Sequence, residues 1–190
     1  SWITYMTTIL GLSGSLRSRS FNTALLAAAA GMMPAGIQLK ITTIQGIPLY
    51  NEDVESTEGE PKSVTVLKRQ ISDADGLLIS TPEYNHSIPG VAKNAIDWLS
   101  RPLSDIPHIF GGRPIAIMGA AMSNFGTIQA QRAWLPVLKA LGAQVWTGGR
   151  LLVSEAHNVF DASGNLVNTQ IEEELRVFIE GFANHVASNE

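Results

Sequence analysis

The chain contains no cysteine among its 190 residues. Disulfide bonds, thiolate metal sites and a cysteine nucleophile are therefore excluded. Basic residues are also few, since 13 lysines and arginines stand against 17 acidic residues and leave a formal net charge of -4. Binding to a nucleic-acid backbone normally needs a basic face, so no nucleic-acid partner is expected.

Long apolar runs and metal-binding patterns are lacking as well. No run is long enough to span a bilayer and no signal-peptide pattern opens the chain, so we expect a cytoplasmic protein with no membrane partner. The four histidines show no HExxH-type spacing, so no bound metal is expected. Residues 1–6 are expected to be disordered or an upstream remnant, because the first strand pattern begins just after them.

The apolar content is sufficient for one sizeable core. Hydrophobic residues make up 45% of the chain, which fits a single domain over residues 1–190. Residues 45–61 are polar and contain proline and glycine, so they are predicted to form a loop. Strands are predicted at 7–12, 37–44, 75–81, 113–120 and 144–147, the last open to extension as far as 153, and helices at 22–33, 62–72, 91–99, 127–141 and 171–186.

Five strands that alternate with five helices predict βαβ units, and hence a parallel sheet with helices on both faces. The size fits a flavodoxin-like, doubly wound, five-stranded α/β fold of strand order 2-1-3-4-5, with three α/β/α layers. Ligands in that architecture bind beyond the carboxyl ends of the strands, near the switch between the first and third strands. The loops after the first, third and fourth strands are therefore where a site is expected.

The first of these loops, in GLSGSLRSRSFN at residues 11–22, carries serines and two arginines where a strand leads into a helix. Backbone N–H groups and the macrodipole at a helix start bind anions, and hydroxyls with Arg17 add donors. Ser18 or Ser20 is expected to cap the helix. The loop lacks the lysine of a P-loop and the glycines of GxGxxG, and Ser15 stands where GxSxG needs glycine. We interpret it as a phosphate cradle, with a serine-rich turn and two solvated arginines as the alternative.

The second loop, TPEYNHSIPG at residues 81–90, can offer backbone polar groups and an aromatic or proline surface to a flat, conjugated ligand. A Tyr84 that merely covers the core is an alternative of nearly equal weight. Pro89 is predicted at the first helical position. The third loop, AAMSNFG at residues 120–126, is small and polar enough for a ring to approach closely.

The motifs GSLRSRSFN, TPEYNHSIPGVAKNAIDWLSR and IPLYNED resemble the NAD(P)H-dependent FMN reductase family, a flavodoxin-like group that includes quinone, azo-dye and chromate reductases. The resemblance covers most of the chain and implies non-covalent FMN, with its phosphate in the first loop. The third loop departs from the more glycine-rich stretch of many relatives. The resemblance assigns the phosphate to Ser13, Ser15, Arg17, Ser20 and Asn22, the border of the ring to Pro82, Glu83, Tyr84 and Asn85, and further contacts to Ser123 and Gly126.

The resemblance also implies the chemistry, in which hydride passes from NAD(P)H to FMN and electrons then pass to a quinone, azo dye, free flavin or metal oxyanion. No residue is assigned an acid or base role, and Glu83 is expected to orient loop or subunit contacts. NADPH is favoured over NADH, with Arg17 as a candidate partner of the 2′-phosphate. Two alternatives remain, a flavodoxin-type carrier that does not oxidise NAD(P)H directly and a protein that keeps the fold without flavin.

A homodimer or homotetramer is expected, with the flavin near a subunit boundary. The helix predicted at 91–99 and its flanks offer more apolar surface than one side of a sheet needs, through Ile88, Val91, Trp98 and Leu99. The segment 49–53 could frame the pocket from a partner. Trp98 as ordinary core is the alternative, and the family likeness favours the closed symmetric assembly.

Overall fold

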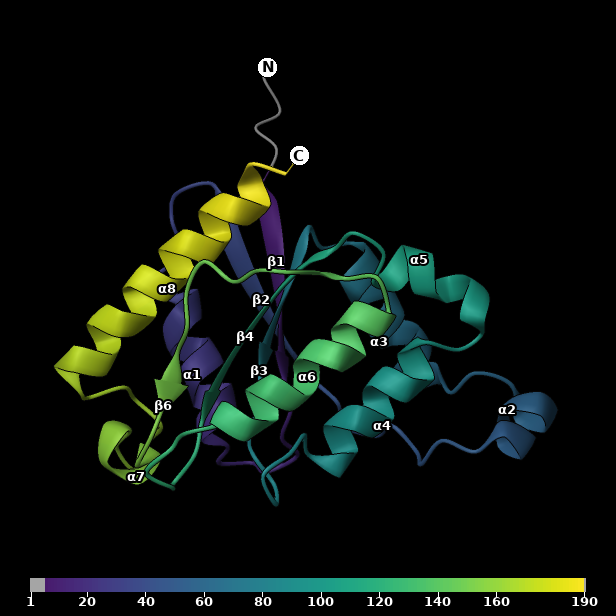
Figure 1. Cartoon of the computed structure of the whole chain (residues 1–190), viewed down its shortest axis with the longest axis horizontal. Helices are drawn as coiled ribbons and strands as arrows, with labels where there is room; N and C mark the ends of the chain where they lie inside the picture. Colours follow the sequence, from purple (N-terminus) through teal and green to yellow (C-terminus); the bar gives the residue numbers. More distant parts are fainter. Residues whose placement is uncertain (1–5, 190) are drawn as a thin grey trace.

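The structure of the protein is a computed structural model and describes residues 6–189. Apart from Met6, the expectation about residues 1–6 therefore lies outside the described residues. Figure 1 shows a central sheet between two layers of helices. The strands are β1 (Thr7–Ser13), β2 (Ile37–Thr43), β3 (Gly76–Ser80), β4 (Pro114–Ala120), β5 (Gln144–Val145) and β6 (Leu152–Val153).

Each strand except β5, which β6 follows directly, is followed by one or more helices. None of them, within residues 6–189, is both long and apolar enough to cross a membrane. The helices are α1 (Phe21–Ala30), α2 (Glu52–Glu58), α3 (Lys62–Ser72), α4 (Gly90–Leu99), α5 (Ile106–Ile109), α6 (Ile128–Ala140), α7 (Ala156–Val159) and α8 (Thr169–Ala187), with a 3-10 turn at Leu103–Asp105.

The sheet has the predicted order, β2-β1-β3-β4-β5, and every strand pair in it is parallel. This confirms the flavodoxin-like, doubly wound arrangement. The three central strands β1, β3 and β4 are buried along their whole length. Strands covered on both faces read as continuous apolar runs, which is why the sequence shows them clearly.

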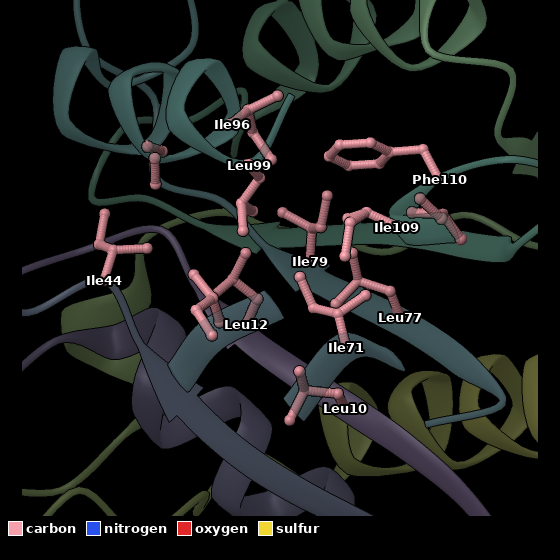
Figure 2. Packing of buried hydrophobic residues seen from close by; sticks show 14 of the residues in the cluster. Leu10, Leu12, Ile44, Ile71, Leu77, Ile79, Ile96, Leu99, Ile109 and Phe110 are labelled. Carbon is pink, nitrogen blue, oxygen red and sulfur yellow. The ribbon is translucent and has the colours of Figure 1, made fainter. Parts of the chain in front are cut away.

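Side chains of the central strands alternate between two cores, one on each face of the sheet. Leu12 and Ile79 point to the first core, and Figure 2 shows Ile96 and Leu99 of α4 reaching toward them. Ile9, next to Leu10 in sequence, packs in the second core with residues of α1 and α8. Burial of both faces fixes the register, because a slip of one residue would exchange the two cores.

The predicted fifth strand is wrong in one respect, since it is split into two short pieces that both pair with β4. Between β5 and β6 the chain leaves the sheet, and the ring of Trp146 packs against Phe178 of α8 with centroids 5.3 Å apart. A Cβ atom at Gly148 or Gly149 would lie within 2.8 Å of that ring. The bulky tryptophan and the two glycines that make room for it therefore interrupt the strand.

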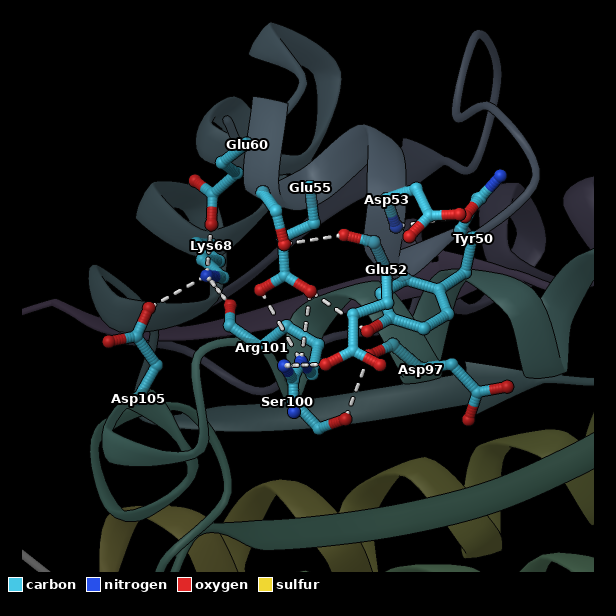
Figure 3. A network of polar contacts seen from close by, with 12 residues as sticks. Tyr50, Glu52, Asp53, Glu55, Glu60, Lys68, Asp97, Ser100, Arg101 and Asp105 are labelled. Atoms are coloured by element: carbon cyan, nitrogen blue, oxygen red, sulfur yellow. Dashed lines mark hydrogen bonds and ion pairs between the residues drawn. The ribbon is translucent and has the colours of Figure 1, made fainter. Parts of the chain in front are cut away.

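The prediction of a loop over residues 45–61 is also wrong, because the segment contains α2. Asn51 caps this helix, as its Oδ1 accepts a hydrogen bond of 2.9 Å from the Asp53 N–H. Figure 3 shows Glu55 of α2 reaching Arg101, which follows α4. Helix α2 has seven residues and none is buried, so it leaves no apolar periodicity in the sequence.

Smaller differences concern helix ends. Helix α1 stops at Ala30, three residues before the predicted end, because Gly31 forms its C-cap. Pro89 occupies the N-cap of α4 and not its first helical position. The 3-10 turn and the helices α5 and α7 have three or four residues each, too few to show a helical period.

The apolar face predicted for subunit contact on α4 lies mostly inside the chain. Trp98 is 1% exposed, its Nε1–H donates to the Pro48 carbonyl at 2.8 Å, and its ring meets Tyr50 edge-on at 5.0 Å. Leu99 is fully buried. Trp98 is therefore ordinary core, whereas Ile88 and Val91 are only partly buried against it.

Candidate functional site

The carboxyl ends of β1, β3 and β4 meet at one edge of the sheet, and so do the three loops that follow them (Figure 1). The Gly14 N–H donates to the Ser80 carbonyl at 2.9 Å, which ties the first loop to the end of β3. A Cβ atom at residue 14 would lie 3.0 Å from Pro82 Cδ and 3.3 Å from the Ser80 oxygen. The glycine is thus needed so that the first two loops can touch.

Two serines of the first loop are oriented by backbone groups. Ser20 caps α1, because its Oγ accepts from the N–H groups of Asn22 and Thr23 at 3.2 and 3.3 Å, whereas Ser18 does not cap it. The Ser15 Oγ accepts from the Arg17 N–H at 3.2 Å. A hydroxyl that accepts from the backbone keeps its own hydrogen for another acceptor. Both serines can therefore donate to an anion held at the start of α1.

Asn22 and Ser13 have protein partners. The Asn22 Oδ1 accepts from Ser80 Oγ at 3.0 Å and from the Ala120 N–H at 2.9 Å, while its Nδ2 donates to the Ala120 carbonyl at 3.0 Å. Ser13 Oγ lies 2.7 Å from Thr23 Oγ1. In this structure the side chain of Asn22 joins α1 to the ends of β3 and β4, so it positions the loops.

Arg17 is exposed and lies beside the first loop. Its guanidinium lies 5.7 Å from the centroid of the Phe21 ring and donates to the Arg19 carbonyl at 3.2 Å. Among residues 6–189, its side chain forms no ion pair with a carboxylate. Arg17 is therefore an uncompensated positive charge at the mouth of the loop.

The second loop turns sharply around Asn85 and His86, whose φ values are 51° and 62°. Tyr84 and Ser87 exchange two backbone hydrogen bonds of 3.1 Å across this turn, which has the positive φ pair of type I′. The side chain of Tyr84 is 42% exposed. Tyr84 is therefore not a cover for the core, and the loop presents it outward beside Asn85.

Glu83 anchors the second loop to the helix that follows the third. Its Oε2 accepts from the Gln129 and Ala130 N–H groups at 2.8 and 3.0 Å, which caps the start of α6. Thr127, at the N-cap position itself, makes no such side-chain bond. This is the loop-orienting role expected for Glu83, although its partner 46 residues away could not be read from the sequence.

The third loop is held by backbone contacts. The Ser123 carbonyl accepts from the Glu155 N–H at 3.1 Å, and the Ser123 Oγ–H donates to the Gly126 carbonyl at 3.3 Å. Gly126 has a φ of 58°, and a Cβ atom there would lie 3.2 Å from the Leu152 backbone, so a side chain would be strained. Phe125 is 76% exposed. The loop therefore brings Ser123 and Gly126 to the same edge as the other two loops.

Hollows of about 750, 690 and 590 Å³ lie on the surface. The first two flank residues 146–150, and the third runs beside Arg17. Their linings do not include residues 82–85. Tyr84 and Asn85, at the expected ring position, are exposed in the single chain.

Comparison with known proteins points to one family. The profile of the family described as NADPH-dependent FMN reductase matches residues 7–158. The chain is 46% identical over 165 residues to the NAD(P)H-dependent FMN reductase of Pseudomonas aeruginosa, covering 87% of each. It is 39% identical over 170 residues to the 2-hydroxy-1,4-benzoquinone reductase of a Burkholderia species, covering 90% of this chain and 91% of that one. Among solved structures, it is similar to the flavoenzyme NAD(P)H:acceptor oxidoreductase FerB from Paracoccus denitrificans, with a TM-score of 0.85, 28% identity and coverage of 96% and 98%.

Proposed function

The chain belongs to the NADPH-dependent FMN reductase family, and on that premise we propose that it oxidises NAD(P)H and passes the electrons through FMN to a quinone. The observation that carries this proposal is the contact at Gly14, where the first loop packs against the second. In this proposal the first loop holds the phosphate and the second borders the ring. A ligand with a phosphate at one end and a flat ring at the other fits two loops held side by side in this way.

The first loop supplies the phosphate contacts in this proposal. The hydroxyls of Ser15 and Ser20 donate to phosphate oxygens, together with the backbone N–H groups at the start of α1. Arg17 turns from Phe21 to add a charge-assisted hydrogen bond. Ser13 and Asn22 do not contact the phosphate in this proposal. They hold α1 against the strand ends and so keep the loop in position.

The second and third loops border the ring in this proposal. Pro82 and Glu83 set the backbone of the second loop, and Tyr84 and Asn85 stand at its tip. Ser123 and Gly126 approach from the third loop, which the contact of Glu83 with α6 keeps in place. When bound, FMN supplies the hydride and electron chemistry, so the chain needs no catalytic acid or base.

Anaerobic titration of the purified holoprotein tests this function. We expect NADPH to bleach the visible flavin absorbance and 1,4-benzoquinone to restore it, with an azo dye, free FMN and chromate compared in parallel. A yellow protein that NAD(P)H leaves unbleached would instead be a flavodoxin-type carrier. A colourless protein that takes up no added FMN would be a protein that keeps the flavodoxin-like fold but does not bind flavin.

We also propose that the flavin site is completed by a second copy of the chain, in a homodimer or a homotetramer. Support comes from four loops at the carboxyl edge of the sheet, each of which exposes a large apolar side chain: Leu16, Leu49, Tyr84 and Phe125. Apolar side chains gathered at one edge are typical of an interaction surface. A partner laid over this edge would cover them together with the open ring position.

The compartment that we propose is the cytoplasm. NAD(P)H is produced inside cells, so an enzyme that consumes it needs access to that pool. Fractionation of the source cells, with detection of the native protein by antibody, tests this location.

A further inference from the structure

Two buried polar side chains connect the second loop to α6, and the function proposed above makes no use of them. Thr81 is the first residue of the loop, and Trp134 lies in the middle of α6. The Trp134 Nε1–H donates to Thr81 Oγ1 at 3.1 Å, and the Thr81 Oγ1–H donates to the Pro82 carbonyl at 2.7 Å. A chain of hydrogen bonds therefore runs from α6 to the peptide group between Pro82 and Glu83.

The direction of this chain is fixed by the chemistry of its members. An indole N–H can only donate, so it occupies an accepting position of the Thr81 hydroxyl. The hydroxyl has a single hydrogen, and that hydrogen goes to the Pro82 carbonyl. Because both side chains are buried, water does not compete for either bond. Trp134 thus holds the hydroxyl of Thr81 in the orientation that binds Pro82.

The bond from Thr81 also orients the N–H of the same peptide group. Among residues 6–189 the only cis peptide bond precedes Pro102, so the bond between Pro82 and Glu83 is trans. In a planar trans peptide the C=O and N–H bonds point to opposite sides. The Glu83 N–H therefore points away from the buried Thr81 hydroxyl. Within residues 6–189 it donates to no protein acceptor, so it is free to donate to a ligand.

The second loop and α6 are held together at more than one place. The Glu83 carboxylate caps the start of α6, about one helical turn before Trp134. At the end of β4, a Cβ atom on Gly119 would collide with Thr127 Oγ1 and with the Thr81 carbonyl oxygen. The bare backbone of Gly119 therefore lets the loop and the start of α6 approach the same point of the sheet. Helix α6 is a rigid support for the loop.

We propose that Thr81 and Trp134 are positioning residues, which hold the Glu83 N–H toward the ring of bound FMN and so raise its reduction potential. This inference rests on the proposed function, in which the second loop borders the ring. A hydrogen bond to a charged acceptor is roughly twice as strong as one to a neutral acceptor, and the reduced flavin ring is the more negative form. An N–H held in place therefore binds reduced FMN more strongly than oxidised FMN.

Replacing Trp134 with phenylalanine keeps a buried ring and removes the N–H donor. Trp98→Phe is the matched control, because Trp98 is equally buried and donates its only N–H to the Pro48 carbonyl at 2.8 Å. Titration of the apoproteins with FMN gives the dissociation constant, and dithionite reduction of the loaded proteins against a reference dye gives the potential.

We expect Trp134→Phe to weaken oxidised FMN about two- to tenfold, the range of a neutral hydrogen bond. Reduced FMN should weaken by about a further tenfold, which lowers the potential of a two-electron couple by about 30 mV. Trp98→Phe should keep the affinity and the potential of the parent, although both variants should unfold at lower urea concentration. If Trp134→Phe matches Trp98→Phe in FMN affinity and potential, Trp134 is ordinary core and the proposal is wrong.

The pair Thr81→Val and Thr81→Ser tests the hydroxyl, and it decides the matter alone if Trp134→Phe does not fold. Valine keeps the shape and should lower affinity and potential as Trp134→Phe does, whereas serine keeps the hydroxyl and should restore both. A serine variant as impaired as the valine variant, or a valine variant like the parent, would overturn the proposal. Dithionite reduction needs no NAD(P)H. A parent protein that NAD(P)H leaves unbleached would therefore refute the proposed function, while the potentials still tested Thr81 and Trp134.

Discussion

At the residue scale, the first loop divides its polar side chains between two tasks. Ser15 and Ser20 accept from nearby backbone N–H groups and keep a hydrogen for a ligand. Asn22, 3% exposed, uses its amide to join α1 to β3 and β4. The family motif contains all three residues, and only the bonding pattern separates those that can contact a phosphate from the one that holds the loops.

Replacing Arg17 with alanine should weaken FMN binding by about 1.5–3 kcal/mol, the contribution of a hydrogen bond from a charged group. The side chain is exposed and forms no ion pair among residues 6–189, so the stability of the apoprotein should hardly change. A fluorescence titration of apoprotein with FMN measures the effect. Arg69→Ala serves as the control, and an Arg17→Ala protein that holds FMN like the parent would show that Arg17 makes no phosphate contact.

Replacing Asn22 with alanine should lower the free energy of unfolding of the apoprotein by about 1–3 kcal/mol. The substitution leaves the buried Ser80 hydroxyl and the Ala120 N–H without their partner, and unsatisfied buried groups carry that cost. Urea unfolding of the FMN-free protein measures it. If stability is retained and FMN affinity alone falls, Asn22 is a ligand contact after all.

At the element scale, α2 shows how charged contacts can hold a helix that has no buried residue. Figure 3 shows the cluster, in which Glu55 receives hydrogen bonds from Tyr50 Oη at 2.8 Å and Arg101 Nε at 3.1 Å. Lys68 of α3 binds Glu60 and Asp105 beside it. The segment of the chain around α2 is thus attached to α3 and α4 by polar side chains.

The attachment of α2 should weaken in acid. The hydrogen bond from Tyr50, together with the charge of Arg101, holds the pKa of Glu55 below its ordinary value of 4.5. A carboxyl group with a lowered folded-state pKa stabilises the fold above its unfolded pKa and loses that effect as the pH falls through the folded pKa. We therefore expect amide exchange in residues 52–58, corrected for intrinsic rates, to quicken below about pH 4.5.

The same exchange measurement on Glu55→Gln at neutral pH should show faster exchange in α2 without acid. Glu58→Gln, at an exposed carboxylate of the same helix, is the matched control and should exchange like the parent. Slow α2 exchange in Glu55→Gln would mean that the backbone and the Asn51 cap, and not the charged cluster, hold the helix.

At the scale of the whole molecule, the open ring position and the exposed apolar loops lead to a prediction about mass. Light scattering of the holoprotein at micromolar concentration should report two or four times the chain mass of 20.4 kDa. Leu49→Lys should shift the population toward the single chain, because Leu49 is 83% exposed at the edge where the partner is expected. Val177→Lys, at an exposed valine of α8, is the control. A holoprotein of about 20.4 kDa would mean that one chain forms the pocket alone.

The parts of the fold that were predictable are those whose signal is local. Buried strands such as β1 and β4 are continuous apolar runs, and α3 and α8 show one buried stripe at helical spacing. Helix α2 and the interruption between β5 and β6 were missed for the opposite reason. Helix α2 is held by Tyr50 and Arg101, and the strand is interrupted where the ring of Trp146 packs against α8. Neither contact leaves a periodic pattern in the sequence.

The order of the sheet, the edge where the site is expected and the family could all be predicted from the sequence, because alternation of strands and helices and two long loop motifs are properties of neighbouring residues. Which residues of those motifs hold the loops together could be seen only in the folded chain. Asn22 meets Ala120 across 98 positions, and Glu83 meets Ala130 across 47. Such bonds depend on how the chain folds back on itself, and the bond from Trp134 to Thr81 exists for the same reason.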